Sequence, residues 1–259
     1  QKSCPFRTAF FIFFLKLTFA MYHKTAAIVL SQVKYSDNSL IVKCFTQAFG
    51  TRSYLLKGIL KNKKSPLATA LFQPLTLLEL VVTNNDVASP TLEYIKEARL
   101  KTTYKSLHTH PYKSAVGIFL SELSSYICPP DTPDEELFNF MASQLVFFDQ
   151  ENFLVHFHLK FLVDLTQYLG FYPDTSAMES PFFNLEEGTF SSTESAPSLS
   201  GEVLLLFKGV LTTSYPLLSQ LHSSRGVRKV LLHQLLKYYQ WHYPNFRKLK
   251  SVEVLEALF

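Results

Sequence analysis

The spacing of apolar side chains changes once along this chain, and that change constrains the fold more than any other feature. Before Tyr104, apolar and polar residues alternate in short runs, which is typical of β-strands with one buried face. After Tyr104, apolar residues recur every three or four positions, as on the buried side of an amphipathic helix. We therefore expect a β domain over residues 21–104 and a helical domain over residues 105–259.

The first domain consists of short candidate strands separated by turn-forming residues. Polar clusters such as 37–39 and 84–86, together with Gly50, interrupt the apolar runs. Five short strands in so small a domain predict a closed barrel, and the five-stranded OB-fold is the nucleic-acid-binding barrel of this size. A β-sandwich is the alternative. The candidate strands are Thr25–Val33, Leu40–Phe45, Thr51–Leu60, Leu75–Thr83 and Leu92–Thr102.

The second domain is predicted to be all-helical, with helix ends marked by capping residues. Pro111 suits the first turn of one helix. Thr132 is predicted as the N-cap of the next, with Pro133 in its first position and Glu135 completing a capping box. The acids of this start complement the helix dipole and do not indicate a catalytic carboxylate pair. Further helices are predicted at Phe153–Leu169, Glu202–Leu211 and Ser224–His242.

Two segments stand outside this pattern. Residues 172–201 are rich in Ser, Thr and Pro and lack helical periodicity, so we expect a loop. Residues 1–20 hold an apolar run between basic residues and resemble a signal peptide. Because the chain begins with Gln and the strand pattern starts at Met21, we interpret residues 1–20 as translated upstream sequence or a signal-like segment.

Positive charge is concentrated in the first domain. Residues 21–104 carry 11 Lys/Arg against 5 Asp/Glu, whereas residues 105–259 carry 11 against 16. A basic module beside an acidic one favours a polyanion-binding surface on the basic part, because phosphate neutralisation releases counterions.

Two basic clusters are the candidate binding sites. The denser one is predicted to contact DNA on the third strand and the loop after it, and comprises Arg52, Lys57, Lys61, Lys63 and Lys64. The other is predicted to bind a partner and lies on one side of the last long helix at i+4 steps, comprising Arg225, Lys229, His233, Lys237 and Trp241. In both cases the alternative is a solvated surface that only aids solubility.

The sequence offers little support for catalysis or for a cofactor. The three cysteines, Cys4, Cys44 and Cys128, are far apart, which fits a reducing cytoplasm better than a disulfide framework. His108 with His110 and His156 with His158 do not supply the convergent ligands of a zinc site. Signatures of nucleotide-binding loops, hydrolase elbows and metalloproteases are absent. We predict no catalytic residues, no metal and no cofactor, so the protein is not expected to be an enzyme.

From Met21 to the C-terminus the chain resembles the bacterial RecO family. The order and spacing of several short segments carry this resemblance: Thr25–Leu30, Gly50, Lys57–Gly58, Phe72–Leu75, Leu78–Glu79, Glu122–Leu123, Leu137–Phe138, Phe157, Leu169–Phe171 with Pro173, Tyr238–Tyr239, His242 and Leu249–Ser251.

The resemblance implies a cytoplasmic, nucleoid-associated mediator of DNA repair and recombination. Such a protein binds single- and double-stranded DNA, anneals complementary strands and, with RecR, helps load RecA onto DNA coated by single-strand-binding protein. It also contacts the acidic C-terminal tail of single-strand-binding protein, for which the Arg225 to Trp241 stripe is the candidate site. It has no membrane partner.

Many members of the family carry a four-cysteine zinc module after the segment that matches Leu169–Pro173. Residues 172–201 contain no Cys, so this chain is expected to lack that module. Two other functions remain open: an OB-fold module whose basic surface binds RNA or an acidic protein, and an enzyme with an unrecognised active site.

Overall fold

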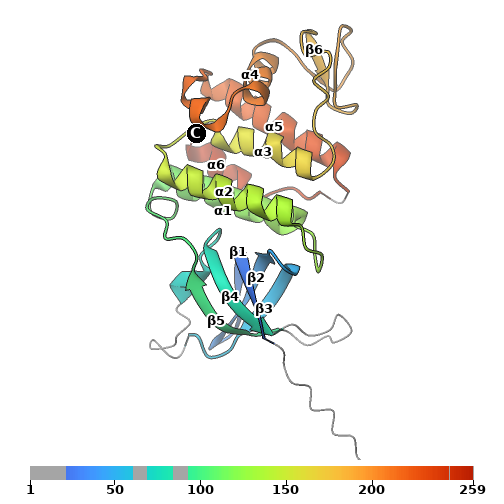
Figure 1. Ribbon diagram of the computed structural model, residues 1–259. Helices are drawn as coiled ribbons and strands as arrows, with labels where there is room; N and C mark the ends of the chain where they lie inside the picture. Colours follow the sequence, from blue (N-terminus) through green and yellow to red (C-terminus); the bar gives the residue numbers. More distant parts are fainter. Residues whose placement is uncertain (1–21, 61–68, 84–92, 245, 259) are drawn as a thin grey trace, which may run out of the picture.

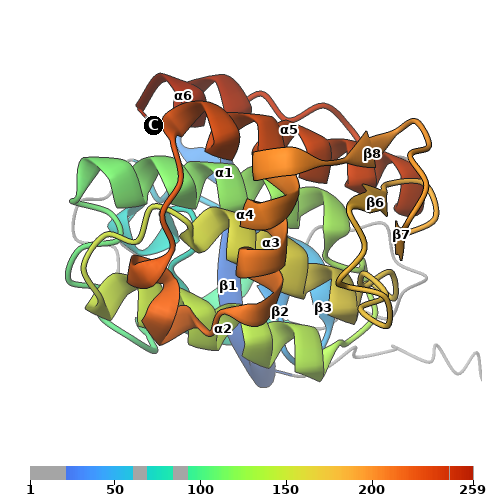
Figure 2. The same ribbon diagram turned by 90° about the horizontal axis from the view of Figure 1, so that it is seen from above.

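The computed structural model describes residues 22–60, 69–83, 93–244 and 246–258. A small β-barrel forms one end of the molecule, and a helical domain forms the opposite end (Figure 1). Seen at right angles, the helices lie across the top of the barrel (Figure 2). Within the described ranges, no helix combines the length and the apolar character that a membrane span requires.

The barrel is formed by five antiparallel-paired strands in the order β3-β2-β1-β4-β5. Their bounds are β1 Tyr22–Ser36, β2 Ser39–Thr46, β3 Gly50–Leu56, β4 Leu77–Thr83 and β5 Ile95–Leu100, with a 3-10 turn, η1, at Thr69–Phe72. The sheet closes where a parallel bridge joins Tyr54 to Glu93 and the Leu55 amide donates to the Glu93 carbonyl at 2.9 Å. The predicted OB-fold barrel is therefore confirmed, and closure excludes the β-sandwich.

Strand β1 is buried on both sides, which explains the apolar run in its middle. Ala27 and Val29 point into the barrel core with Val42, Tyr54 and Leu80. The intervening residues, Ile28 and Leu30, belong instead to the core of the helical domain, together with Phe45, Phe119 and Phe138. Because side chains alternate along a strand, one segment contributes to two cores and joins the domains.

The helical domain contains α1 Pro111–Ile127, α2 Glu135–Gln150, α3 Phe157–Tyr168, α4 Gly201–Thr212, the 3-10 turn η2 Tyr215–Gln220, α5 Arg225–His242 and α6 Val252–Leu258. The predicted start at Pro111 is confirmed. Ser224 is the N-cap of α5, and its hydroxyl accepts from the Val227 amide at 3.2 Å.

The predicted N-cap of α2 is wrong. Helix α2 begins at Glu135, and the side chain of Asp134 accepts from the Leu137 amide at 2.9 Å. The backbone before it is held by strand β3: Thr51 donates to the Pro129 carbonyl at 2.8 Å, and Asp131 has a left-handed φ of 54°. This contact between domains delays the helix by two residues relative to the local capping pattern.

Residues 172–201 were expected to form a loop, but part of them forms a small sheet of order β7-β6-β8. Its strands are β6 Phe182–Asn184, β7 Thr189–Ser191 and β8 Ser198–Leu199. Phe183 lies at its centre, with ring centroids 4.9 Å from Phe190 and 4.7 Å from Phe207. Aromatic packing onto α4 holds this sheet, which the Ser- and Thr-rich sequence did not reveal.

Candidate nucleic-acid interface

Arg52, the first predicted DNA contact, is held within the fold. Its Nη1 atom lies 3.0 Å from Glu93 Oε1, its Nε atom lies 3.0 Å from Asp131 Oδ1, and its side chain is only 14% exposed. Glu93 belongs to the segment before β5, and Asp131 to the connection between α1 and α2. Arg52 thus links the barrel closure to the helical domain, and its charge is neutralised there.

Lys57 lies on an exposed surface at the end of the barrel away from the helices. Its ammonium nitrogen is 4.9 Å from the ring centroid of Tyr94, and that of Lys96 is 4.3 Å from the ring centroid of Tyr22. Tyr22 pairs with Thr83, which in turn hydrogen-bonds Tyr94, so the two rings share one end of the barrel. Figure 1 shows the start of β1 at this end.

We call Tyr22, Lys57, Tyr94 and Lys96 the distal surface. The tyrosine side chains are 50% and 38% exposed, and both lysines are exposed. Exposed rings beside cations suit nucleic acid, because bases stack on the rings while phosphates meet the ammonium groups. The other predicted contacts, Lys61, Lys63 and Lys64, lie outside the described residues.

Sequence reasoning found Lys57 but missed the other three residues of the distal surface. Lys96 and Tyr94 are far from the Lys57 cluster in the sequence and lie beside acids at 93 and 97. Strand alternation gave no usable signal here, because Ile95 and Ala98 are both buried although they lie three positions apart, and a register shift interrupts the pairing of β4 with β5 between them. Only barrel closure places Lys96 and Tyr94 beside β3.

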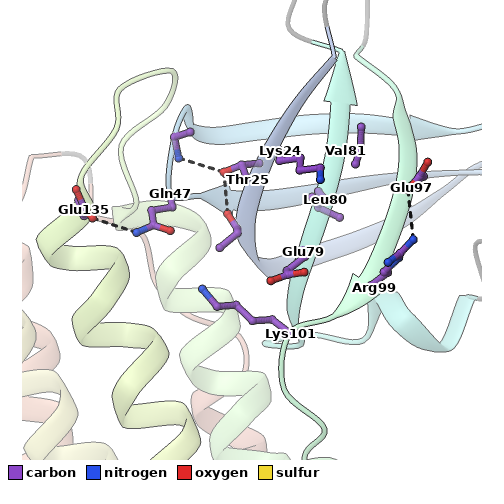
Figure 3. A pocket seen from close by; sticks show the side chains of 12 residues that line it. Lys24, Thr25, Gln47, Glu79, Leu80, Val81, Glu97, Arg99, Lys101 and Glu135 are labelled. Atoms are coloured by element: carbon purple, nitrogen blue, oxygen red, sulfur yellow. Dashed lines mark hydrogen bonds and ion pairs between the residues drawn. The ribbon is translucent and has the colours of Figure 1, made fainter.

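A cleft of about 710 Å³ along the outer face of β1, β4 and β5 has mixed charge (Figure 3). Arg99 Nη2 lies 3.7 Å from Glu97 Oε2 on the same strand. Across the cleft, Gln47 Nε2 donates to Glu135 Oε1 at 3.1 Å. Three cations and three carboxylates line it, so it does not form a polyanion site; these are Lys24, Arg99, Lys101, Glu79, Glu97 and Glu135.

Helix α6 contacts the first half of the predicted partner-binding stripe on α5 and leaves the second half exposed. Glu256 of α6 accepts from Arg225 through its carbonyl at 2.8 Å, and its carboxylate contacts Lys229 at 3.0 Å and His233. Burial raises the pKa of Glu256, but the hydrogen bonds and charges of Lys229 and His233 outweigh this and lower it overall. Lys237 and Trp241 are exposed, and their side chains form no hydrogen bond or ion pair with the described part of the chain.

Two of the four histidines considered as metal ligands, His156 and His158, are buried in the fold. Burial lowers the pKa of His156 to about 4 and that of His158 to about 3, and the His156 ring bonds the Ser223 hydroxyl at 2.7 Å. Residues 172–201 contain no Cys and so offer no thiolate donors for the four-cysteine module that the family resemblance implied. Among the described residues, no group of three or more potential ligands converges.

Comparison with known proteins agrees with this arrangement. The family model described as "Recombination protein O N terminal" matches residues 21–104, and "Recombination protein O C terminal" matches residues 108–253. The DNA repair protein RecO of Flavobacterium psychrophilum is 39% identical over 238 residues, covering 91% of this chain and 98% of the relative.

Two further relatives with the same name come from other bacteria. The protein of Christiangramia forsetii is 38% identical over 236 residues, covering 91% of this chain and 98% of its own length. That of Bacteroides fragilis is 31% identical over 248 residues, covering 92% and 100%. Two matched family models and full-length relatives lead to one conclusion: this chain belongs to the RecO family.

Proposed function

We propose that this protein is a DNA-binding recombination mediator that acts in the repair of double-strand breaks and gaps. The observation that carries the proposal is the distal surface, where two lysines lie over two exposed tyrosine rings at one end of an OB-fold barrel. Stacking and phosphate contacts together hold an unpaired strand without regard to sequence. Lys61, Lys63 and Lys64 follow Leu60 directly in the chain and extend the proposed contact.

Membership of the family supports the further steps of this proposal. The protein anneals complementary strands, and with RecR it helps RecA replace single-strand-binding protein on single-stranded DNA. The acidic tail of that protein contacts α5 at Lys237 and Trp241, which are exposed, rather than at Lys229, which Glu256 already neutralises. These contacts are binding events and require no catalytic residue.

Charge reversal tests the distal surface. In the variant Lys57→Glu, Lys96→Glu, affinity for a fluorescent single-stranded oligonucleotide should fall at least tenfold, and the slope of log affinity against log salt should flatten by about 1.4. The matched control is the double change Lys101→Glu, Lys105→Glu, at two exposed lysines in the connection between the domains. Equal salt slopes in both variants would refute the assignment.

A second variant separates stacking from charge. Replacing Tyr22 and Tyr94 by Leu removes the rings and should weaken binding by roughly 1–3 kcal/mol for each stacked base, whereas Phe at both positions should retain it. Competition with RNA of the same sequence then distinguishes a DNA mediator from an RNA-binding module. Annealing of complementary oligonucleotides, with and without single-strand-binding protein, tests the mediator function directly.

A further inference from the structure

A second groove, of about 800 Å³, lies between the barrel and the helical domain. Its walls come from β1 and β2 on one side and from α1 and the segment after α5 on the other. Its lining includes Ser31, Lys43, Ile118, Tyr126 and Arg247. None of these belongs to the distal surface or to the α5 stripe, so the groove is a separate feature of the molecule.

The α1 wall of this groove exposes apolar side chains. Ile118 is 47% exposed and Tyr126 is 39% exposed. The guanidinium carbon of Arg247 lies 6.0 Å from the Tyr126 ring centroid, which places a cation beside an accessible aromatic ring. A stacking surface of this kind fits a planar base.

Lys43 and Arg247 line the groove, and Lys248 and Lys250 follow Arg247 in the chain, where the charge of Lys250 helps to lower the pKa of Glu122. Arg247, Lys248 and Lys250 are exposed, and none forms an ion pair in the described part of the chain. Lys43 Nζ donates to the Ser125 carbonyl at 2.6 Å, and burial lowers its pKa. Because this acceptor is a neutral carbonyl, the ammonium group retains donor capacity for an anion.

One carboxylate lines the groove, and the fold already occupies it. Glu122 accepts from the backbone amides of Lys250 and Ser251 at 3.0 and 2.8 Å, and from the Ser251 hydroxyl. It thereby fixes the basic segment against α1. The result is a site with a tyrosine ring on its wall and one cation on each side, Lys43 and Arg247, which matches a chain in which bases and phosphates alternate.

We propose that this groove binds a second, unpaired nucleic-acid strand, with a base stacked on Tyr126 and phosphates beside Arg247 and Lys43. The proposal rests on the DNA-binding function proposed above and adds a site to it. The groove volume of about 800 Å³ lies within the range of about 300–1,000 Å³ that is typical of ligand pockets, which is room for a short piece of single strand. Two sites on different parts of one molecule hold two strands close together.

The test uses the full chain, a fluorescent oligothymidine probe and two groove variants, Tyr126→Leu and the double change Arg247→Glu, Lys248→Glu. The matched controls are Tyr126→Phe and the double change Lys101→Glu, Lys105→Glu, which alters the same net charge at exposed positions outside the groove. Circular dichroism and thermal melting establish that each variant is folded.

We expect wild type to bind two strands per protein and both groove variants to bind one, with the remaining affinity within about twofold of wild type. Annealing of complementary oligonucleotides should slow at least tenfold, and the controls should behave as wild type. If wild type binds no single strand, the proposed DNA-binding function fails. If wild type binds but the groove variants match the controls, the groove assignment alone is overturned. Loss of binding to an acidic peptide, with strand binding unchanged, would also overturn it and identify a peptide site.

Discussion

The barrel and the helical domain use their basic side chains in different ways. At the distal surface, Lys57 and Lys96 lie over exposed rings. In the helical domain, buried Lys113 donates to three oxygens, and Lys229 is paired with Glu256. A positive residue in the sequence is therefore a binding candidate only if the fold leaves its charge uncompensated. Arg52, which is paired in the barrel, and Arg247, which forms no ion pair among the described residues of the helical domain, depart from the contrast between the domains but obey this rule.

Substitution of Lys113 should give the largest loss of stability, because its buried ammonium group donates three hydrogen bonds within the fold. Its ammonium group bonds Ser106 Oγ at 2.7 Å and the carbonyls of Asp149 and Glu151 at 3.0 and 2.6 Å. Lys113→Met should cost about 3–5 kcal/mol of unfolding free energy, since it leaves buried acceptors and the Asp149 carboxylate without their cation. Urea denaturation measures this. The neighbouring exposed Lys105→Met should change stability by less than about 0.5 kcal/mol.

Arg52 and Lys57, both on the β3 side of the barrel, should separate stability from DNA binding. Arg52→Met removes one partner of the buried Glu93 carboxylate, and its contact with Asp131, and should lower unfolding free energy by about 3 kcal/mol. Lys57→Met should leave stability within about 0.5 kcal/mol but weaken binding to single strands. If Arg52→Met has the same melting temperature as wild type, Arg52 does not have the structural role assigned to it here.

Acid should weaken the joint between the domains through Asp149. Burial raises the pKa of this carboxyl, but backbone hydrogen bonds from Lys105, Ser106 and Leu107, with the charge of Lys113, outweigh it and lower the pKa below its usual value. A lowered folded-state pKa stabilises the protein above the unfolded value near 4, and the contribution is lost as pH falls through the folded value. Asp149→Asn should cost about 2 kcal/mol at neutral pH and reduce the loss of stability below pH 4. If stability falls with acid in Asp149→Asn as it does in wild type, other carboxylates control the acid sensitivity of the fold.

Lys229 should give the smallest stability effect, although it belongs to a well-formed ion pair. Its side chain is 54% exposed, and exposed pairs contribute about 0–1 kcal/mol. Lys229→Met should therefore lower stability by about 0.5 kcal/mol and leave binding of the acidic tail peptide unchanged. Lys237→Met should instead weaken binding of that peptide. Fluorescence anisotropy measures peptide binding by both variants. If Lys229→Met weakens binding more than Lys237→Met does, the peptide binds near Arg225 and Lys229, at the start of the predicted stripe.

The fold was largely predictable because its signals are local and repeated. Alternation along the strands, the proline at Pro111 and the N-cap at Ser224 each act within a few residues. The α2 cap failed because Thr132 is involved in a contact with the other domain: a Cβ added to Gly50 would lie 2.3 Å from the Thr132 carbonyl oxygen. The loop predicted at residues 172–201 was wrong in part because the small sheet around β6 is stabilised by packing on Phe207, which lies outside that segment.

The sequence alone determined a basic barrel followed by an acidic helical domain, since hydrophobic period and charge distribution are properties of consecutive residues. Tertiary structure decided which cations are available. Glu93 and Asp131 neutralise Arg52, and Glu256 neutralises Lys229, although each of these acids lies more than 20 residues away in the chain. Likewise, Lys57 meets Tyr94, and Arg247 meets Tyr126, only after folding. Charge pairing acts across a few ångströms of space, so the order of residues along the chain does not reveal it.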